Sequence, residues 1–441
     1  MRRMETLDRA VRTRTDPTLI NLKDATPLRR AFRMKRRDFL KTSSLAAGAA
    51  VVGLGASEAR DLRTLPSNGA TFGRKNGQLV HIMRGLVQSV SDDGGETWSK
   101  PNLLFQTGVT IHSDSHVLGL LRLQSGKIGL SYGRMKKVQN FMRQEIVFRT
   151  SADDGHSWSE ENSMTPLDGD DLYALHQSMV QLKSGRLILP AHTNFSHNYV
   201  GRPRGIGHGW LPEYYATHML VSDDEGVTWI PKNALYLWKD LGYGGLAPCG
   251  EACVAEAPDG RVLMLARTTN MRALRSYSED GGETWTFVEL TELSSSNAPI
   301  RLRRIPQSDD LLIVWNQVTA EEHRNGFGRS RLSTAISKDS GTTWGNFQNL
   351  EVCPGLSKNA HIVDSEPPQF VRAGEKTHPG QVPNNSIKAI ERYSYPNVNF
   401  FNDKIYIDHD HYITPNQWVG KGERRHNCQR LHILPMESIY A

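Results

Sequence analysis

The sequence predicts an all-β protein built as a six-bladed β-propeller, because two short patterns recur along it. The first is the phrase SDDGGETW at Ser91, which fits SxDxGx[ST]W and returns in four further versions. The versions are spaced by roughly 55 to 70 residues, the size of a four-stranded blade with its loops. The second is an apolar strand, a tight turn and another apolar strand, found six times. The further versions begin at Ser151, Ser222, Ser278 and Ser337.

The six hairpins follow one another along the chain. Segments such as CVAEAPDGRVLMLAR alternate apolar or β-branched residues with polar ones around a turn, which favours strands over helices. The last hairpin, NVNFFNDKIYIDHDHY, has no Ser-Asp phrase after it, so five of the six blades carry the phrase. The turns lie at Gly77, Gly126, Gly185, Gly260, Asp309 and Asp403.

The repeated phrase has the chemistry of a turn between two strands. Its Asp can accept backbone N–H bonds, its Gly can adopt positive φ, and its Trp can bury a large ring against neighbouring strands. The phrase is therefore expected to stabilise the fold, and its Asp residues are not expected to be catalytic.

Composition argues against a disordered, a nucleic-acid-binding and a disulfide-rich protein. With 441 residues and 38% hydrophobic content the chain can bury a large core. The net charge of +6 owes much to the basic first forty residues, so no nucleic-acid-binding face is expected. Four cysteines are too few for a disulfide framework, although Cys249 and Cys253 could either bridge or stay reduced. A zinc site built on these two cysteines would need a second matched pair of ligands, and the sequence has none.

The amino-terminal region resembles a twin-arginine export signal over residues 34–59. MKRRDFLK begins at Met34, and a weakly hydrophobic run of about twelve residues follows, too short to span a bilayer. Cleavage after Ala59 would leave an exported, periplasmic or extracellular protein, with the propeller over residues 62–441. Residues 1–33 are expected either to be disordered or to be included only because the start codon was assigned too early. The alternative is a basic tail that happens to contain two arginines.

A propeller also assigns side chains to faces. In an up-and-down blade with strands a to d, the a–b and c–d turns share one face, the bottom, and the start of a, the end of b and the start of c share the top. Counting about nine residues back or seven forward from the hairpin turns, or eight back from the Ser-Asp phrases, reaches mostly polar residues, which predicts a cation-rich pocket at the top centre. They are Arg84, His116, Gly133 beside Arg134, Arg143, His176, His192, Tyr214, Glu251, Arg267, Asn270, Asn316, Arg329, Tyr395 and Asp410.

These features resemble the sialidase (neuraminidase) superfamily, whose turn phrase is called the Asp-box or BNR repeat. The resemblance covers about residues 65–435. EACVAEAPDGRVLMLAR is similar to the segment that implies Glu251 as the activating base and Arg267 as a ligand of the substrate carboxylate. RSRLSTAIS is similar to an RxxL segment that implies Arg329 as another such arginine. SYPNV is similar to the last-blade start that implies Tyr395 as the nucleophile.

The implied set is chemically coherent. The planar guanidinium group of an arginine can donate two hydrogen bonds to a sugar carboxylate. A carboxylate nucleophile would meet repulsion of about 4 kcal/mol from that anion at 4 Å and an effective dielectric near 20, whereas a neutral Tyr395 would not. Glu251 can take the phenolic proton, and a double displacement retains configuration. The structural alternatives are a simple Glu251–Arg267 ion pair, a surface Arg329 and a strand-end Tyr395.

The sequence departs from the family in its first blade. The family opens this blade with an Arg-Ile-Pro segment, but the expected position, near Ser67, holds no arginine. The RIP at Arg304 belongs beside a bottom turn, so it is not assigned to the site. Arg84 is the expected third cation, with Arg134 and Arg143 as alternatives.

The proton donor is expected to be Asp114 in IHSDSHV, because the first blade is too short for the family's acid/base loop. His112 and His116 lie close by in sequence, so the segment could equally form a structural hydrogen-bond cluster. It could also form a divalent-metal site with His176 and His192. His176 is otherwise expected to contact the substrate.

The sequence thus predicts an exported sialidase-like glycoside hydrolase that releases terminal sialic acid or a related acidic sugar from glycans. Its expected partners are the glycan and the twin-arginine export machinery. No organic cofactor, assigned metal ligand, nucleic acid or membrane span of the mature protein is expected. The alternatives are a propeller glycosidase or lyase acting on another sugar, which the missing arginine favours, and a non-catalytic glycan-binding propeller.

Overall fold

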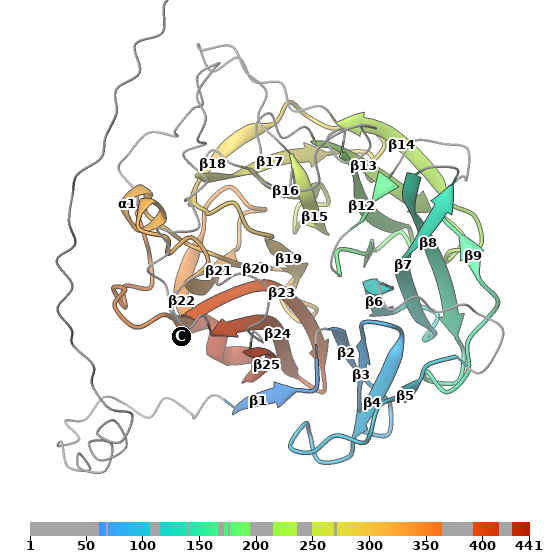
Figure 1. The fold of residues 1–441 in the computed structure, drawn as a ribbon. Coiled ribbons are helices and arrows are strands. Elements are labelled where there is room, and N and C mark those ends of the chain that lie inside the picture. The colour runs from blue at the N-terminus through green and yellow to red at the C-terminus, as the bar shows by residue number, and fades with distance from the viewer. Residues whose placement is uncertain are drawn as a thin grey trace, which may run out of the picture. The chain divides into compact units, whose positions relative to one another are not determined.

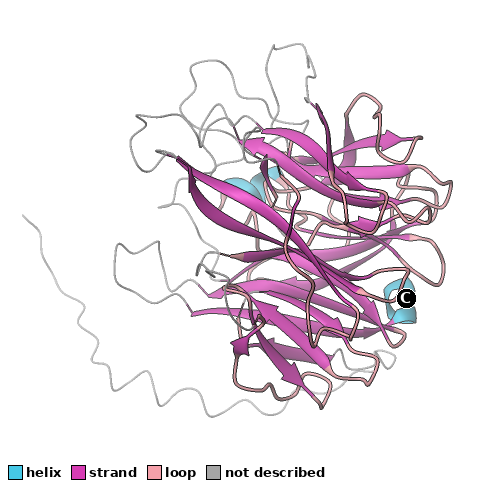
Figure 2. Ribbon diagram, turned by 90° about the vertical axis from the view of Figure 1, so that its right-hand side faces the viewer, coloured by secondary structure: helices cyan, strands magenta, loops and turns pink. Residues whose placement is uncertain are grey.

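The protein is a six-bladed β-propeller, as predicted, with six antiparallel sheets in a ring (Figure 1). The computed structural model describes residues 61–67, 69–105, 115–138, 141–165, 172–174, 177–194, 215–235, 249–268, 271–363, 391–413 and 426–441. Within these ranges the helices are α1 (Ala320–Arg324) and the 3-10 helix η2 (Met436–Tyr440), so strands dominate (Figure 2). No helix in the described part has the length and apolar character needed to cross a bilayer.

The strands of the first two blades follow chain order from the inner strand outward, and in the third blade the first two short strands both pair with the next strand. The three blades comprise β2 (Gly69–Gly73), β3 (Leu79–Met83), β4 (Val87–Ser91) and β5 (Asn102–Leu103); β6 (His116–Arg122), β7 (Ile128–Val138), β8 (Phe141–Ser151) and β9 (Asn162–Ser163); and β10 (Leu172–Tyr173), β11 (Val180–Gln181), β12 (Leu187–Asn194), β13 (Tyr215–Ser222) and β14 (Ile230–Leu235).

Blades four and five repeat the pattern, and the last blade closes the ring. They comprise β15 (Gly250–Glu256), β16 (Val262–Arg267), β17 (Arg272–Ser278) and β18 (Glu289–Ser294); β19 (Arg301–Arg304), β20 (Leu311–Trp315), β21 (Arg331–Ser337) and β22 (Gly345–Val352); and β23 (Glu391–Phe401), β24 (Lys404–Ile413), β25 (His426–Pro435) and β1 (Asp61–Leu65).

Ring closure depends on the first described strand. β1 pairs antiparallel with β25, with Leu62 opposite His432, and so forms the outermost strand of the last blade (Figure 1). A sheet built from the first and the last described strands joins them through main-chain hydrogen bonds and covers the edge of β25. The sequence analysis placed the propeller from residue 62 but did not predict this pairing.

Each Asp-box is a hydrogen-bonded turn between the third and fourth strands of its blade. In the fourth blade, Ser278 Oγ donates to Asp280 Oδ1 (2.7 Å) and accepts from the Gly282 N–H (2.7 Å). The Thr284 N–H donates to Asp280 Oδ1 (2.9 Å), and Trp285 Nε1 donates to the Gly282 carbonyl (3.2 Å). The same Ser–Asp and Gly–Ser bonds occur in the other four boxes. The box is thus structural, as the phrase predicted.

The Asp-boxes also connect neighbouring blades. Asp154 Oδ2 accepts from the Lys75 N–H (2.6 Å), in the hairpin turn of the preceding blade. The Asp259 N–H likewise donates to Ser340 Oγ (3.3 Å). Because boxes contact hairpin turns, both lie on the same face, the bottom, as expected. Arg304 of the RIP segment pairs with Asp309 there (2.6 Å), which agrees with its exclusion from the site.

Removing one box carboxylate should weaken the fold without changing the site. Burial raises the pKa of Asp280, but hydrogen bonds from Thr284 and Ser278 outweigh it and lower the pKa to about 2. The ionised form thus contributes stability that is present above pH 4 and is lost as the pH falls through about 2. We expect Asp280→Ala to cost about 1–2 kcal/mol of unfolding free energy at pH 7, because the group is exposed. Urea unfolding at pH 7 measures this cost, and the cost should be smaller near pH 2. An equal cost at both pH values would contradict a stabilising role of the ionised Asp280 carboxylate.

The core consists of apolar clusters between adjacent sheets. One cluster joins Leu263 and Leu265 of the fourth blade to Leu302 and Trp315 of the fifth, and the box residue Trp344 packs against it. The same interleaving recurs between other blades. Cys249 and Cys253 are buried free thiols, so the bridge left open by the sequence is absent.

Candidate functional site

The site begins with a buried ion pair in the fourth blade. β15 and β16 form one hairpin in which Gly250 lies opposite Arg267. Arg267 Nη1 lies 2.6 Å from Glu251 Oε2, and the two side chains are only 9% and 4% exposed. At this burial a carboxylate and a guanidinium stabilise each other's charged forms. The pair is the Glu251–Arg267 contact that the sequence left open as a structural alternative.

Glu251 stands on a β-bulge. The register between β15 and β16 shifts between Gly250 and Cys253, and Glu251 has φ of +49°. A non-glycine residue adopts positive φ at a cost, and such residues gather at functional sites, where a bulge turns a side chain away from the pleat. The bulge therefore aims the Glu251 carboxylate in a direction that a regular strand would not allow.

Tyr395 stands on a matching bulge in the sixth blade. The register between β23 and β24 shifts between Ser394 and Asn397, and Tyr395 has φ of +57°. Arg301, which is buried in β19, donates from Nε to the Pro396 carbonyl (3.1 Å) and so holds the bulge from the neighbouring blade. Two inner strands of the ring thus use the same distortion to place a polar side chain.

Asn297 connects the arginines of the site. Its side-chain Oδ1 accepts from Arg267 Nε, and its carbonyl accepts from Arg329 Nη2 (3.2 Å). The Arg329 guanidinium carbon lies 5.2 Å from the centroid of the Tyr395 ring, within cation–π range. Glu251, Arg267, Arg329 and Tyr395 therefore form one continuous group drawn from blades four, five and six, as the sequence analysis expected.

Two further carboxyl groups lie beside this group in β24. Burial raises the pKa of Asp410 to about 6, against a hydrogen bond from Tyr412 and the charge of Arg329. Burial raises the pKa of Asp408 to about 7, against a hydrogen bond from Asn397. The site thus holds the buried pair Glu251–Arg267 next to two carboxyl groups whose pKa is raised by burial.

Arg301 adds a buried positive charge to the same region. Burial lowers its pKa, while the charges of Cys253, Asp408 and Glu251 act in the opposite direction. Its surface is only 2% exposed, so it acts on the backbone of the Tyr395 bulge rather than on a bound sugar.

The sequence analysis missed Asn297 and Arg301. Both lie in NAPIR, the segment that enters the inner strand of the fifth blade. Counting about nine residues back from the degenerate turn at Asp309 leads to this segment, so the rule used for the other blades would have found it.

The other residues predicted for the site lie in other parts of the chain. Arg84 lies in the exposed turn after β3, at the top of the first blade. Of its alternatives, Arg134 pairs with Glu145 (2.8 Å) and Glu161 (2.9 Å), which accounts for its charge. The side chain of Arg143, and the whole of Asp114, His112 and His176, lie outside the described residues.

A comparison with protein families identifies the chain. The family model of the BNR repeat-like domain matches residues 85–407. The chain belongs to this family. The assignment agrees with the five boxes and the six blades, which are features of the Asp-box resemblance described above.

Two curated relatives of this BNR protein are named sialidases. The sialidase of Clostridium perfringens is 27% identical over 225 residues, which is 47% of this chain and 53% of the relative. The sialidase of Paraclostridium sordellii is 25% identical over 270 residues, which is 55% of this chain and 61% of the relative. The matches therefore span between half and two thirds of these relatives. They agree with the family assignment.

Solved structures share the fold of this BNR protein. A protein of unknown function from Dyadobacter fermentans has a TM-score of 0.53 and 18% identity, with 85% of this chain and 98% of that chain covered. The NanB sialidase from Streptococcus pneumoniae has a TM-score of 0.50 and 14% identity, with 84% and 68% covered. At these identities the likeness shows the fold alone, so function must be argued from the site.

Proposed function

We propose that this BNR protein is an exported exo-α-sialidase, which releases terminal sialic acid or a related acidic sugar with retention of configuration. The observation that carries the proposal is the joining of Glu251, Arg267, Arg329 and Tyr395 into one group from three blades. Residues 34–59 support export through the twin-arginine route on sequence grounds alone.

The arginines would bind the sugar carboxylate. Arg329 is half-buried, which leaves its guanidinium group accessible, while Asn297 and Tyr395 restrict its orientation. Arg267 is more deeply buried and is held by Glu251 and Asn297. Guanidinium groups ordered before binding lose less side-chain entropy when they take up a carboxylate. Arg84 remains the proposed third cation, and His176 a proposed substrate contact.

Tyr395 would act as the nucleophile. Its phenolic oxygen bonds to the anomeric carbon while the bond from that carbon to the leaving oxygen breaks. The phenolic proton passes to the Glu251 carboxylate, and a proton donor, proposed as Asp114, protonates the leaving group. Water then attacks the anomeric carbon and gives up a proton to the Asp114 carboxylate, while the phenolic oxygen leaves and Glu251 returns its proton to that oxygen. Two inversions give net retention.

The proposal is tested with the mature protein and a chromogenic α-sialoside between pH 4 and 8. We expect release of free sialic acid, with the α-anomer appearing first by NMR. Uronides and neutral glycosides serve as comparison substrates, because the first blade lacks the Arg-Ile-Pro segment expected near Ser67. Turnover of one of these without turnover of the sialoside would favour another glycosidase or a lyase. Binding of sialylated glycans without turnover would favour a glycan-binding propeller.

Arg329→Gln should weaken the handling of an acidic substrate. Loss of a charge-assisted hydrogen bond to the sugar carboxylate costs about 1.5–3 kcal/mol, so kcat/KM for the sialoside should fall about 10- to 100-fold. Arg304→Gln is the matched control, since Arg304 pairs with Asp309 at the bottom face. Equal effects of the two substitutions on steady-state kinetics would contradict the role of Arg329.

A further inference from the structure

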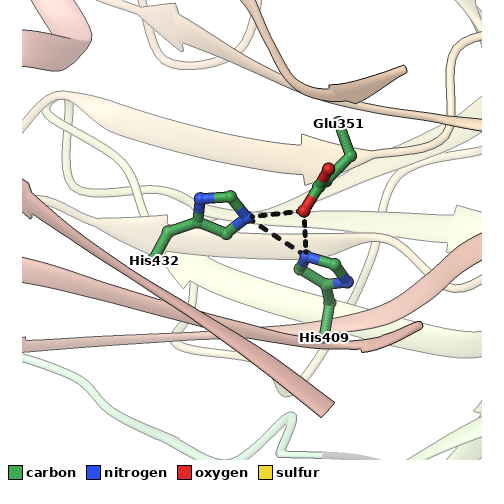
Figure 3. A group of neighbouring side chains, drawn as sticks. All are labelled: Glu351, His409 and His432. Atoms are coloured by element: carbon green, nitrogen blue, oxygen red, sulfur yellow. Dashed lines mark hydrogen bonds and ion pairs between the residues drawn. The ribbon is translucent and has the colours of Figure 1, made fainter. Parts of the chain in front are cut away.

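Three side chains that could ligate a metal converge between the fifth and sixth blades, and none of them belongs to the group described above. Glu351 extends from β22, His409 from β24 and His432 from β25, and Figure 3 shows that their polar atoms point toward one another. His409 and His432 are buried, and the Glu351 side chain is 11% exposed. The two imidazole rings are stacked with their centroids 5.3 Å apart.

The spacing of the three ligand atoms fits one small cation. Glu351 Oε1 lies 3.5 Å from His409 Nε2 and 3.3 Å from His432 Nε2, and the two nitrogens are 3.2 Å apart. A tetrahedral zinc ion binds nitrogen and oxygen at about 2.0–2.2 Å, which separates neighbouring ligand atoms by about 3.3–3.5 Å. The observed triangle therefore matches three corners of such a tetrahedron.

The hydrogen bond on the far side of one ring supports this reading. His409 Nδ1 lies 3.1 Å from the Asp410 carbonyl, which can only accept. If Nδ1 carries the proton, Nε2 directs a lone pair toward the carboxylate oxygen of Glu351 and the nitrogen of His432. A backbone carbonyl that fixes the tautomer in this way is the usual outer contact of a metal-bound histidine.

We propose that Glu351, His409 and His432 bind one divalent transition-metal ion of the zinc type. Two imidazoles and a carboxylate are ligands that zinc accepts, and a solvent molecule would complete the tetrahedron. Arg430 donates to the same oxygen of Glu351 (2.7 Å). That oxygen has a second lone pair for the ion, although the guanidinium charge lowers the affinity.

The proposed ion has a structural role at the closure of the ring. It would join the outer strand of the fifth blade, through Glu351, to two strands of the sixth. His432 lies opposite Leu62 of β1, so one ligand stands in the strand pair that closes the ring. A ligand that binds only the folded state stabilises it by mass action, so the ion should strengthen closure.

The test begins with the whole untagged wild-type chain, freed of metal with a chelator and then dialysed. We expect one equivalent of Zn²⁺ to bind in competition with a chromogenic chelator, and Co²⁺ to give the visible absorption of a tetrahedral site. Saturating Zn²⁺ should raise the midpoint of thermal unfolding by about 5 °C over the chelator-treated protein. No stoichiometric binding by folded wild-type protein, together with an unchanged midpoint, would overturn the proposal.

Variants show whether the ion occupies these residues, since the chain has 16 histidines. Glu351→Gln and His432→Gln should each weaken Zn²⁺ binding at least tenfold and abolish the zinc-dependent shift in unfolding midpoint. His81→Gln is the control, because His81 is also buried but bonds to Thr71 and the Ser67 carbonyl in another blade. It should keep one equivalent of Zn²⁺. Full binding by His432→Gln would place the ion elsewhere and refute the assignment. None of these readouts requires sialidase activity.

Discussion

Tyr395→Phe is expected to lower kcat/KM for a chromogenic α-sialoside by at least about 100-fold while leaving the fold intact. The substitution removes only the phenolic oxygen, so the ring stays on its bulge and keeps its contact with Arg329. Without that oxygen no covalent intermediate can form, and Glu251 has no proton to accept. Steady-state kinetics, with a binding assay for the unreacted sialoside, measures the effect.

Tyr406→Phe is the matched control for this substitution. Tyr406 lies in the same blade, near the turn between β23 and β24, and packs against Phe401. It should retain normal turnover. If Tyr395→Phe retained turnover as well, the nucleophile would have to be another group. If Tyr395→Phe bound the sialoside normally but did not turn it over, a purely glycan-binding role of the wild type would be excluded.

Arg267→Leu should destabilise the protein by about 3 kcal/mol as well as abolish turnover. The substitution removes a guanidinium group that lies 2.6 Å from the Glu251 carboxylate. Because the Glu251 side chain is only 4% exposed, its charge loses its closest positive neighbour. The midpoint of urea unfolding at pH 7 measures this cost. A loss below about 1 kcal/mol would mean that solvent reaches Glu251 and compensates its charge.

A second substitution separates stability from catalysis at this pair. Glu251→Gln in the Arg267→Leu background removes the poorly compensated charge, so it should recover much of the lost unfolding free energy. Turnover should not return, because a glutamine cannot accept the phenolic proton. Recovery of turnover in the double variant would show that Glu251 has only a structural role.

Much of the fold could be predicted because it depends on local chemistry. A box such as SEDGGETW forms its hydrogen bonds within a few residues, from Ser278 to Trp285. Each hairpin likewise pairs strands separated by a short turn, as in β15 and β16. Contacts of such short range are encoded in contiguous sequence, and their repetition predicted both the number of blades and the face that each turn occupies.

The candidate site was only partly predictable for the same reason. Glu251 and Arg267 belong to one hairpin, so sequence spacing alone brought them together. Arg329 and Tyr395 followed from equivalent positions in successive blades. Asn297 joins two of these blades through its side chain and its carbonyl, and no local pattern marks such a contact. The bulges at Glu251 and Tyr395 are likewise visible only in backbone angles.

The sequence by itself predicted the repeated blades and the structural role of the Asp-boxes, and the family resemblance selected the four residues that meet at the site. Only the tertiary structure decided that β1 closes the last blade, that Asn297 links Arg267 to Arg329, and that Glu351 meets His409 and His432. The physical reason is range. Turn chemistry and strand periodicity act between near neighbours in the chain, whereas these contacts join separate strands whose meeting depends on how the whole ring packs.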